Sequence, residues 1–238
     1  MCHGMFLAKS SSMKVIYYGH ACFLVEVSGK RLLFDPFITP NPLAKMIKVK
    51  NIQADYMLIS HGHDDHIADA IKIAKQTGAL TVANFEVAEW LNKKGAAKVH
   101  ALNPGGYVDF DFGRVKSVSA IHSSSMPNGT YGGVAGGFVV ESKEGNFYYS
   151  GDTALTGDMR LIGDTTKLMF AALCIGGNFT MGVEDAVRAA EFIRCHEILG
   201  VHYDTFPEIK INHLKAQEKF TSSGRNLHLL KIGEAMNF

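Results

Sequence analysis

The feature that most constrains this chain is the six-residue run His61-Gly62-His63-Asp64-Asp65-His66, which gathers three imidazoles and two carboxylates in one short segment. The run directly follows residues 56–60, an apolar stretch with the composition of a strand. Neutral imidazole nitrogens and carboxylate oxygens are ligands that first-row divalent metals accept. We therefore expect a metal site where this strand ends.

The spacing within the run predicts two metal ions. His61 and His63 are two residues apart, so on extended backbone their side chains leave the same face and can hold one ion. Asp65 and His66 follow where the chain turns into a helical segment, and they point toward a second position nearby. A His-rich surface turn is the weaker alternative, because four potential ligands converge in this segment. Asp64 is interpreted as a helix-start carboxylate with no ligand role.

Three later segments also end in a polar residue of the ligand type. Residues 114–121 alternate like a strand and lead to His122, the aromatic run 146–150 leads to Asp152, and residues 197–201 lead to His202. Functional side chains commonly lie where a strand gives way to a loop. Each of these residues alone is more typical of a structural role, but together and in order they form a pattern.

The order HxHxDH, a distant His, Gly-Asp-Thr and a last His resembles the metallo-β-lactamase superfamily of metal-dependent hydrolases. The framing phrases are similar to those of the UPF0173 metal-dependent hydrolases, which are similar in turn to the ascorbate-6-phosphate lactonase branch. These phrases are Tyr18-Gly19-His20-Ala21-Cys22, Leu33-Phe34-Asp35-Pro36-Phe37, Gly151-Asp152-Thr153-Ala154-Leu155, Asn178-Phe179-Thr180-Met181-Gly182 and His202-Tyr203-Asp204-Thr205-Phe206-Pro207. The resemblance extends from about Met13 onward. It implies an α/β fold of the αββα four-layer sandwich type, whereas periodicity alone supports only a mixed α/β chain.

The resemblance also implies a ligand set. One metal would be held by His61, His63 and His122, the other by Asp65, His66 and His202, with Asp152 bridging the two. The expected cofactors are two divalent ions, with zinc favoured and manganese, iron or nickel as alternatives. A hydroxide between the ions would be the nucleophile, and Asp65, Asp152 and His20 are the expected catalytic residues.

Four further residues are candidates around that site. Asp35 is the best candidate for orienting a ligand imidazole from the second shell, with a turn carboxylate as an even alternative. His20 could contact substrate or donate a proton, and a structural hydrogen bond is an equal alternative. Asn178 and Thr180 lie in a Gly-flanked loop that could line the pocket or simply shape it. The Gly-rich residues 128–137 match no phosphate-binding motif, and we expect a flexible loop beside the metals.

The predicted activity is dinuclear, metal-dependent hydrolysis of a small ester, lactone or phosphoester. Three alternatives stay open at this point. The first is a phosphodiesterase or nuclease acting on RNA or a cyclic nucleotide, and the second is an iron-dependent oxidoreductase on the same scaffold. The third is a binding protein that retains a metal for folding.

Composition is that of an ordinary globular enzyme. The 238 residues are 47% hydrophobic, which favours a single domain over residues 13–238, preceded by a leader over 1–12 that would be an upstream start, a tag remnant or a disordered arm. The net charge of +1 predicts a small-molecule substrate and no extended nucleic-acid surface, with Lys45, Lys48 and Lys50 as a small patch at most. Four cysteines without CxxC spacing, no signal peptide and no membrane span favour the cytoplasm. The oligomeric state is left open.

Periodicity and turn residues also predict the regular elements. Strands are expected near residues 14–18, 21–27, 31–35, 56–60, 98–101, 107–110, 115–122, 136–142 and 147–150. Helices are expected near residues 67–77, 85–94, 183–195 and 214–222.

Overall fold

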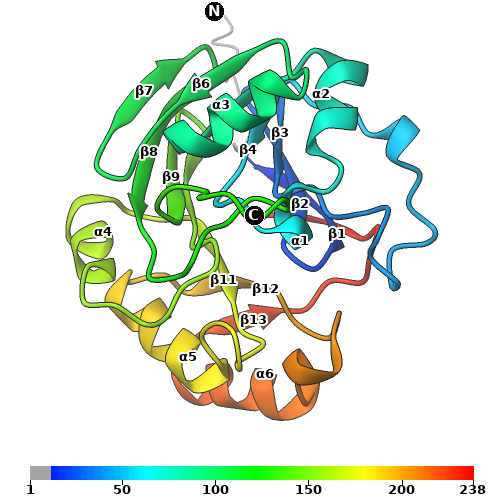
Figure 1. Ribbon diagram of the computed structural model, residues 1–238. Helices are drawn as coiled ribbons and strands as arrows, with labels where there is room; N and C mark the ends of the chain where they lie inside the picture. The colour runs from blue at the N-terminus through cyan, green and yellow to red at the C-terminus, as the bar shows by residue number, and fades with distance from the viewer. Residues whose placement is uncertain (1–11) are drawn as a thin grey trace, which may run out of the picture.

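The structure of the chain is a computed structural model that describes residues 12–238, and within them the strands form two seven-stranded sheets (Figure 1). The first sheet has the order β14 (Ala235–Asn237), β1 (Lys14–Gly19), β2 (Cys22–Val27), β3 (Lys30–Phe34), β4 (Tyr56–Leu58), β5 (Leu80–Ala83) and β6 (Val99–Ala101). The second has the order β13 (Asn226–His228), β12 (Glu197–Val201), β11 (Phe170–Cys174), β10 (Gly145–Tyr149), β9 (Gly136–Ser142), β8 (Gly113–Ser119) and β7 (Tyr107–Phe110). Apart from Ser12, the predicted leader lies outside the described residues.

Helices cover the outer face of each sheet. The helices on the first sheet are α1 (Asp64–Ile67), α2 (Ala70–Thr77) and α3 (Phe85–Lys93), and those on the second are α4 (Met159–Thr165), α5 (Val183–Phe192) and α6 (His213–Ser222). Two short 3-10 turns, Val49–Asn51 and Pro207–Ile209, complete the regular structure of the described residues. None of the helices among these residues is long and apolar enough to cross a membrane.

Three apolar cores hold the layers together. Phe23 and Phe34 of the first sheet pack against Phe138 and Tyr149 of the second, and these rings are fully or almost fully buried. A second core lies between the first sheet and α1 to α3, and a third lies between the second sheet and α4 to α6. Side chains that alternate across a strand supply both faces of each sheet. The predicted αββα sandwich is therefore confirmed.

Strand direction brings the candidate site residues to one edge. β1 and β2 are antiparallel, as are β2 and β3, so β1 runs parallel to β3 and β4. By the same reasoning β8 runs parallel to β10, β11 and β12. The C-terminal ends of parallel strands meet at the same edge of a sheet, so the residues that follow β1, β3 and β4 share one edge and those that follow β8, β10 and β12 share another. Contacts of Asp152 with His66 and of His202 with His20 join the two edges.

The interpretation of Asp64 as a helix start is confirmed, but the helix expected over residues 67–77 is divided in two. The helix begins three residues earlier at Asp64, and it is interrupted after Ile67 before α2 begins at Ala70. Asp69 explains the break, because its buried carboxylate accepts hydrogen bonds from the backbone N–H groups of Ile38 and Thr39 at 2.8 and 2.7 Å. A side chain committed to the loop after β3 holds the chain in a turn at this point.

Other predicted elements agree with the structure to within three residues at each end, but the predicted strand over 115–122 ends at Ser119 as β8. His122 consequently lies in a loop. Sequence analysis did not identify β5, β11, β13, β14 or α4. The first four are short or uniformly apolar, so they carry no alternation to mark them.

Candidate metal centre

All seven predicted metal ligands lie at the edge where the two sheets meet. His61, His63, Asp65 and His66 follow β4, and they come from the turn that begins α1. His122 follows β8, Asp152 follows β10 and His202 follows β12. The ligand atoms of six of them lie in two groups, which we name the first cluster (His61, His63, His122) and the second cluster (Asp65, His66, His202). His20 lies with the second cluster, and Asp35 lies close to both His61 and His66.

The first cluster consists of three imidazoles. His61 Nε2 lies 2.9 Å from His63 Nδ1, so the two rings meet as the sequence spacing predicts. The ring of His122 lies 5.1 Å from that of His61 and 5.2 Å from that of His63, between centroids. His61 is fully buried, whereas His63 and His122 are partly exposed. This cluster therefore opens to solvent.

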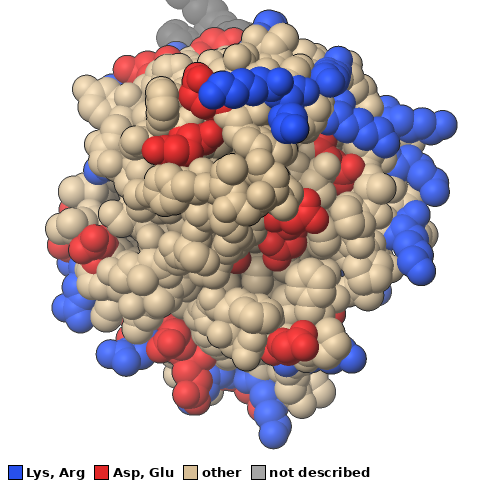
Figure 2. All heavy atoms as spheres, viewed as in Figure 1, with Lys and Arg blue, Asp and Glu red and all other residues tan. Residues whose placement is uncertain are grey.

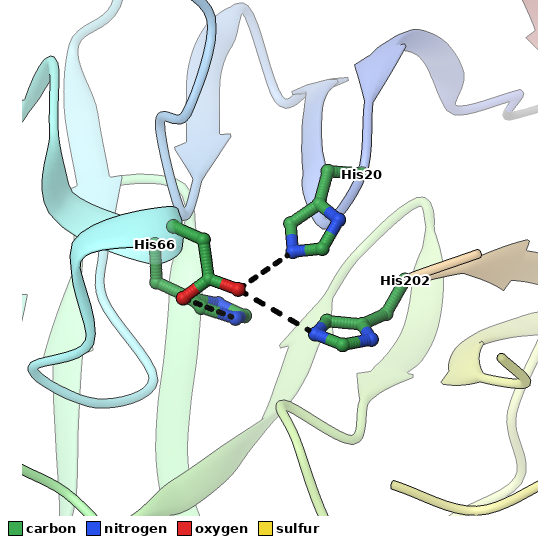
Figure 3. Close-up of side chains that lie close together, drawn as sticks. His20, His66 and His202 are labelled. Atoms are coloured by element: carbon green, nitrogen blue, oxygen red, sulfur yellow. Dashed lines mark hydrogen bonds and ion pairs between the residues drawn. The ribbon is translucent and has the colours of Figure 1, made fainter. Parts of the chain in front are cut away.

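The second cluster contains a carboxylate and is more deeply buried. His66 and His202 are buried, and Asp65 keeps 27% of its side chain exposed. Asp65 Oδ2 lies 3.8 Å from His202 Nε2, and its Oδ1 lies 4.0 Å from His66 Nε2. Figure 3 shows that the rings of His66 and His202 are directed toward a common point, together with that of His20.

Asp152 lies between the clusters. Its Oδ2 is 2.9 Å from His202 Nε2 and 3.3 Å from His66 Nε2 on one side, and 3.7 Å from His122 Nε2 on the other. The preceding residue, Gly151, has φ +58°, and a Cβ there would lie 2.4 Å from the carbonyl oxygen of Gly136. Only glycine fits this turn, so Gly151 is what allows the carboxylate to point between the sheets.

Asp35 fixes the proton positions of two imidazoles. Its Oδ2 accepts from Ser60 Oγ at 2.5 Å, from Tyr149 OH at 2.6 Å and from His66 Nδ1 at 2.7 Å. Because the Ser60 hydroxyl donates to Asp35, it accepts from His61 Nδ1 at 2.9 Å. Both imidazoles thus carry a proton on Nδ1 and direct Nε2 into the site, where His61 Nε2 faces His63 Nδ1 and His66 Nε2 has no hydrogen-bond partner among the described residues.

The burial of these groups, and their contacts with one another, shift their pKa values. Burial lowers the pKa of His61 well below its ordinary value, and it also lowers the pKa of His63 and His122. Burial raises the pKa of Asp152, but the imidazoles of His66 and His202 outweigh it and hold that pKa well below the usual range. The carboxylate of Asp152 is therefore charged, and it lies between the desolvated rings of the first cluster and the imidazoles of His66 and His202 that stabilise its charge.

The residues fit a bound cation. His66 Nε2 and Asp152 Oδ1 are buried atoms without a hydrogen-bond partner among the described residues. Buried polar atoms are rarely left unpaired, because desolvating them costs about 1–3 kcal/mol each. Burial also lowers the pKa of His66, but the carboxylates of Asp152, Asp65 and Asp35 raise it well above its usual value. Without an ion a proton supplies the positive charge here, and a divalent ion would supply more.

His20, which follows β1 of the first sheet, lies against the second cluster. Its Nε2 is 3.1 Å from Asp65 Oδ2, and its Nδ1 is 2.9 Å from Thr205 Oγ1. The side chain has no exposed surface, and burial lowers its pKa to about 4. Sequence analysis did not single out Thr205, Ser60 or Tyr149, although each lies beside a residue that it did identify.

The remaining candidates lie in loops around the centre. Asn178 has φ +54° and is exposed, and Thr180 donates from Oγ1 to the carbonyl of Met181 at 3.3 Å, so both shape their loop. The Gly-rich residues 128–137 are fastened by Asn84, which donates to the carbonyls of Gly132 and Val134 at 2.8 and 2.9 Å. Ser124 Oγ donates to the carbonyl of Gly132 at 2.7 Å and accepts from Gly62 N at 3.1 Å, which ties this loop to the turn of the first cluster.

Residues 14–202 match the family model described as the β-lactamase superfamily domain, in agreement with the two-sheet fold and its His/Asp edge. The fold and the centre thus define a metal-dependent hydrolase of the metallo-β-lactamase superfamily. A "UPF0173 metal-dependent hydrolase" of Methylacidiphilum infernorum is 51% identical and one of Flavobacterium johnsoniae is 53% identical, each over 94% of this chain and 99% of theirs. The chain belongs to this UPF0173 family of metal-dependent hydrolases.

A solved structure supports the same assignment. Igni18, a metallo hydrolase from the hyperthermophilic archaeon Ignicoccus hospitalis, superposes with a TM-score of 0.86 at 33% sequence identity. The match covers 95% of this chain and 98% of that one. The predicted family and the predicted enzyme class, a metal-dependent hydrolase, are both confirmed.

Proposed function

We propose that this enzyme holds two divalent ions and cleaves a small ester, lactone or phosphoester. The observation that carries the proposal is the position of Asp152, whose Oδ2 contacts imidazoles of both clusters. A carboxylate between two cations reduces their mutual repulsion. When bound, such ions would lower the pKa of water from about 15.7 to about 7 and polarise the bond under attack.

Different side chains would hold the ions, orient the ligand imidazoles and face the substrate. The first cluster would hold one ion and the second cluster the other, while Asp35 keeps His61 and His66 in the tautomer that exposes Nε2. His63, His122 and Asp65 are the partly exposed members, so we infer that substrate approaches from their side. Figure 2 shows acidic side chains near α1 at the centre of this face, surrounded by uncharged surface.

Zinc is the ion that this donor set favours, with manganese, iron or nickel as alternatives. Imidazole and carboxylate donors suit all four metals. A thiolate would select for softer ions, but the nearby Cys174 is buried, and burial raises the pKa of its thiol to about 11. We infer that Cys174 stays protonated and that the centre uses only nitrogen and oxygen ligands.

A phosphodiester substrate is the second candidate, and one observation favours it. Lys45, Lys48, Lys50 and Lys72 line a hollow of about 420 Å³, which has no acidic side chain among its described lining residues. Figure 2 shows Lys and Arg side chains on the right of the viewed face, where Figure 1 places residues 40–50. Such a surface would attract a polyanion. An oxidoreductase gains no comparable support, and a cytoplasmic location stays a prediction.

Metal content and a substrate panel test the proposal. We expect two ions per chain after loading with zinc, and hydrolysis of lactones, activated esters or phosphoesters that disappears with chelation. Asp152→Asn should lower both metal content and activity, the latter by more than about 100-fold, since it loses more than an outer-sphere contact. The control, Asp109→Asn, removes a carboxylate that pairs with Arg114 on the surface, and it should behave like the parent.

The same panel separates the two substrate classes. Phosphodiester cleavage that weakens steeply with added salt, beside salt-independent lactone cleavage, would favour the lysine-lined hollow as part of the binding site. One ion per chain under saturating metal, with activity intact, would contradict the dinuclear proposal.

A further inference from the structure

The backbone at His20 has a left-handed conformation, which sets the position of the imidazole ring. His20 follows β1 with φ +56°, a region that residues other than glycine seldom adopt. Its carbonyl accepts from Tyr17 OH at 3.0 Å and from the backbone N–H of His202 at 2.8 Å. Strained residues persist where their surroundings over-determine them, most often at functional sites. The imidazole is thus presented rigidly to the second cluster.

Proton positions on His20 favour a lone pair toward Asp65. The Thr205 hydroxyl lies 2.9 Å from His20 Nδ1, and it can donate weakly to the carbonyl of Tyr203 at 3.4 Å. When the hydroxyl donates to that carbonyl, it accepts from Nδ1–H. In this tautomer His20 Nε2 has no proton, although it lies 3.1 Å from a carboxylate oxygen. Two lone pairs at this distance repel each other unless a cation lies between them.

The separation between His20 Nε2 and Asp65 Oδ2 matches that of two ligands that share one ion. Ligand atoms of His20, Asp65, His66 and His202 all lie within 4.8 Å of one another. With metal–ligand bonds of about 2.0–2.2 Å, atoms at adjacent corners of a coordination shell are about 3.0–3.5 Å apart. The 3.1 Å between His20 Nε2 and Asp65 Oδ2 falls in that range. The ring of His20 also lies only 4.2 Å from that of His202, between centroids.

From this geometry we infer that His20 is a fourth protein ligand of the ion in the second cluster, bound through Nε2, with Thr205 setting its tautomer. The inference rests on the proposed second ion. The role differs from substrate contact or proton donation, because a side chain without exposed surface reaches no substrate from solvent. It also makes the second cluster richer in protein ligands than the first, with His20, Asp65, His66 and His202 around one position.

The alternative is that His20 Nε2 carries the proton and merely donates it to Asp65. His20 would then be a positioning residue. The two roles predict different results for His20→Gln, since glutamine can still donate an N–H toward Asp65 but offers no imidazole. His20→Ala removes both functions.

Cobalt(II) titration in a His122→Ala background tests the inference, because this background disables the first cluster and reports on the second. We expect one cobalt per chain in the background variant. Both His20→Ala and His20→Gln should weaken that site by more than about 100-fold and change its visible absorption spectrum. Tight binding by His20→Gln with the parent spectrum would overturn the inference in favour of a positioning role.

Two controls keep the outcomes distinct. His213→Ala removes a half-exposed histidine that pairs with Asp204 outside the clusters, and it should leave the titration unchanged. NMR of the cadmium-loaded, unmutated enzyme needs no variant to fold, and it should show coupling between cadmium and the His20 ring; absence of that coupling beside clear signals from His66 and His202 would contradict the inference. A parent enzyme that never binds more than one ion would instead overturn the proposed function.

Discussion

The two clusters hold similar residue types in very different surroundings. The first is made of imidazoles alone, and two of its three members, His63 and His122, reach solvent. The second adds the carboxylate of Asp65, and its imidazoles on His66 and His202 are buried. A charged ligand in a desolvated position attracts a cation more strongly than a neutral ring at the surface does. We infer that the second cluster retains its ion and that the first exchanges ion and solvent more readily.

The anchoring of the clusters differs in the same direction. His66 donates from Nδ1 directly to the buried carboxylate of Asp35, whereas His61 reaches Asp35 only through the Ser60 hydroxyl. His122 lies in a loop after β8, where the backbone of the neighbouring Ile121 donates to Thr153 Oγ1 at 2.9 Å. A rigid outer shell holds ligands in their productive orientation. One continuous edge thus combines a firmly anchored cluster with a more accessible one.

The largest expected effect comes from removing one imidazole of each cluster in turn. His122→Ala should retain one ion per chain and most of the thermal stabilisation that metal provides, while His202→Ala should lose most of it. A ligand at about 1,000 times its Kd stabilises the folded state by about 4 kcal/mol, so the melting temperatures with and without metal report the difference. Differential scanning calorimetry with elemental analysis makes the measurement.

The reverse outcome would contradict the inference that the second cluster retains its ion more strongly than the first. If His202→Ala kept its ion and its metal-dependent stabilisation while His122→Ala lost both, the first cluster would be the tighter one. Metal-free samples of both variants serve as the control, because they separate loss of binding from damage to the fold.

An intermediate effect is expected from Asp35→Asn, because this variant removes the carboxylate that anchors His66 directly and His61 through Ser60. An amide keeps one acceptor oxygen and no charge, so it cannot replace both Oδ2, which accepts from the side chains of Ser60, Tyr149 and His66, and Oδ1, which accepts from the backbone N–H of Ser60. The anchoring of His66 is therefore weakened. We expect metal affinity at the second cluster to fall by roughly 10–100-fold, and by less at the first, where Asp35 acts through Ser60. Competition against a chromophoric chelator measures both affinities. An equal loss at both sites would contradict the difference in anchoring.

Much of this centre could be predicted from the sequence because each ligand type follows a strand directly. Once β4, β8, β10 and β12 are in sheets, the topology brings the residues after them to one edge, and local spacing is sufficient for His61 and His63. The sandwich itself came from a resemblance, since alternation marks only some of the strands. β11, which is wholly buried, has no polar face for a pattern to reveal.

The outer shell could not be predicted in the same way. Tyr149 and Asp35 are 114 residues apart and meet across the two sheets, and Thr205 reaches His20 across 185 residues. Such contacts depend on the direction of single side chains, which no local period specifies. The break between α1 and α2 has the same origin, because Asp69 binds backbone groups of the distant residues Ile38 and Thr39.

The smallest effect is expected at a His–carboxylate pair outside both clusters, which serves as a reference for the other variants. Glu197 Oε2 lies 2.7 Å from His228 Nε2, and both side chains are partly exposed. Burial raises the pKa of Glu197, but the hydrogen bonds from His228 and Asn226 outweigh it and hold that pKa below its ordinary value of 4.5. A carboxyl group with a lowered pKa in the folded state stabilises the fold above its unfolded pKa, and this contribution is lost as pH falls through the folded pKa.

Glu197→Gln should therefore lower the free energy of unfolding near neutral pH by less than about 1 kcal/mol, the size expected of an exposed pair. The difference from the parent should shrink as pH falls below about 4. Urea unfolding of metal-free protein across this pH range makes the measurement, so that metal release does not contribute. A loss as large as that of His202→Ala in metal-loaded protein would mean that ordinary His–carboxylate pairing, and not an ion, accounts for the strength of the second cluster. A small loss would leave the ion as the source of the difference between the clusters.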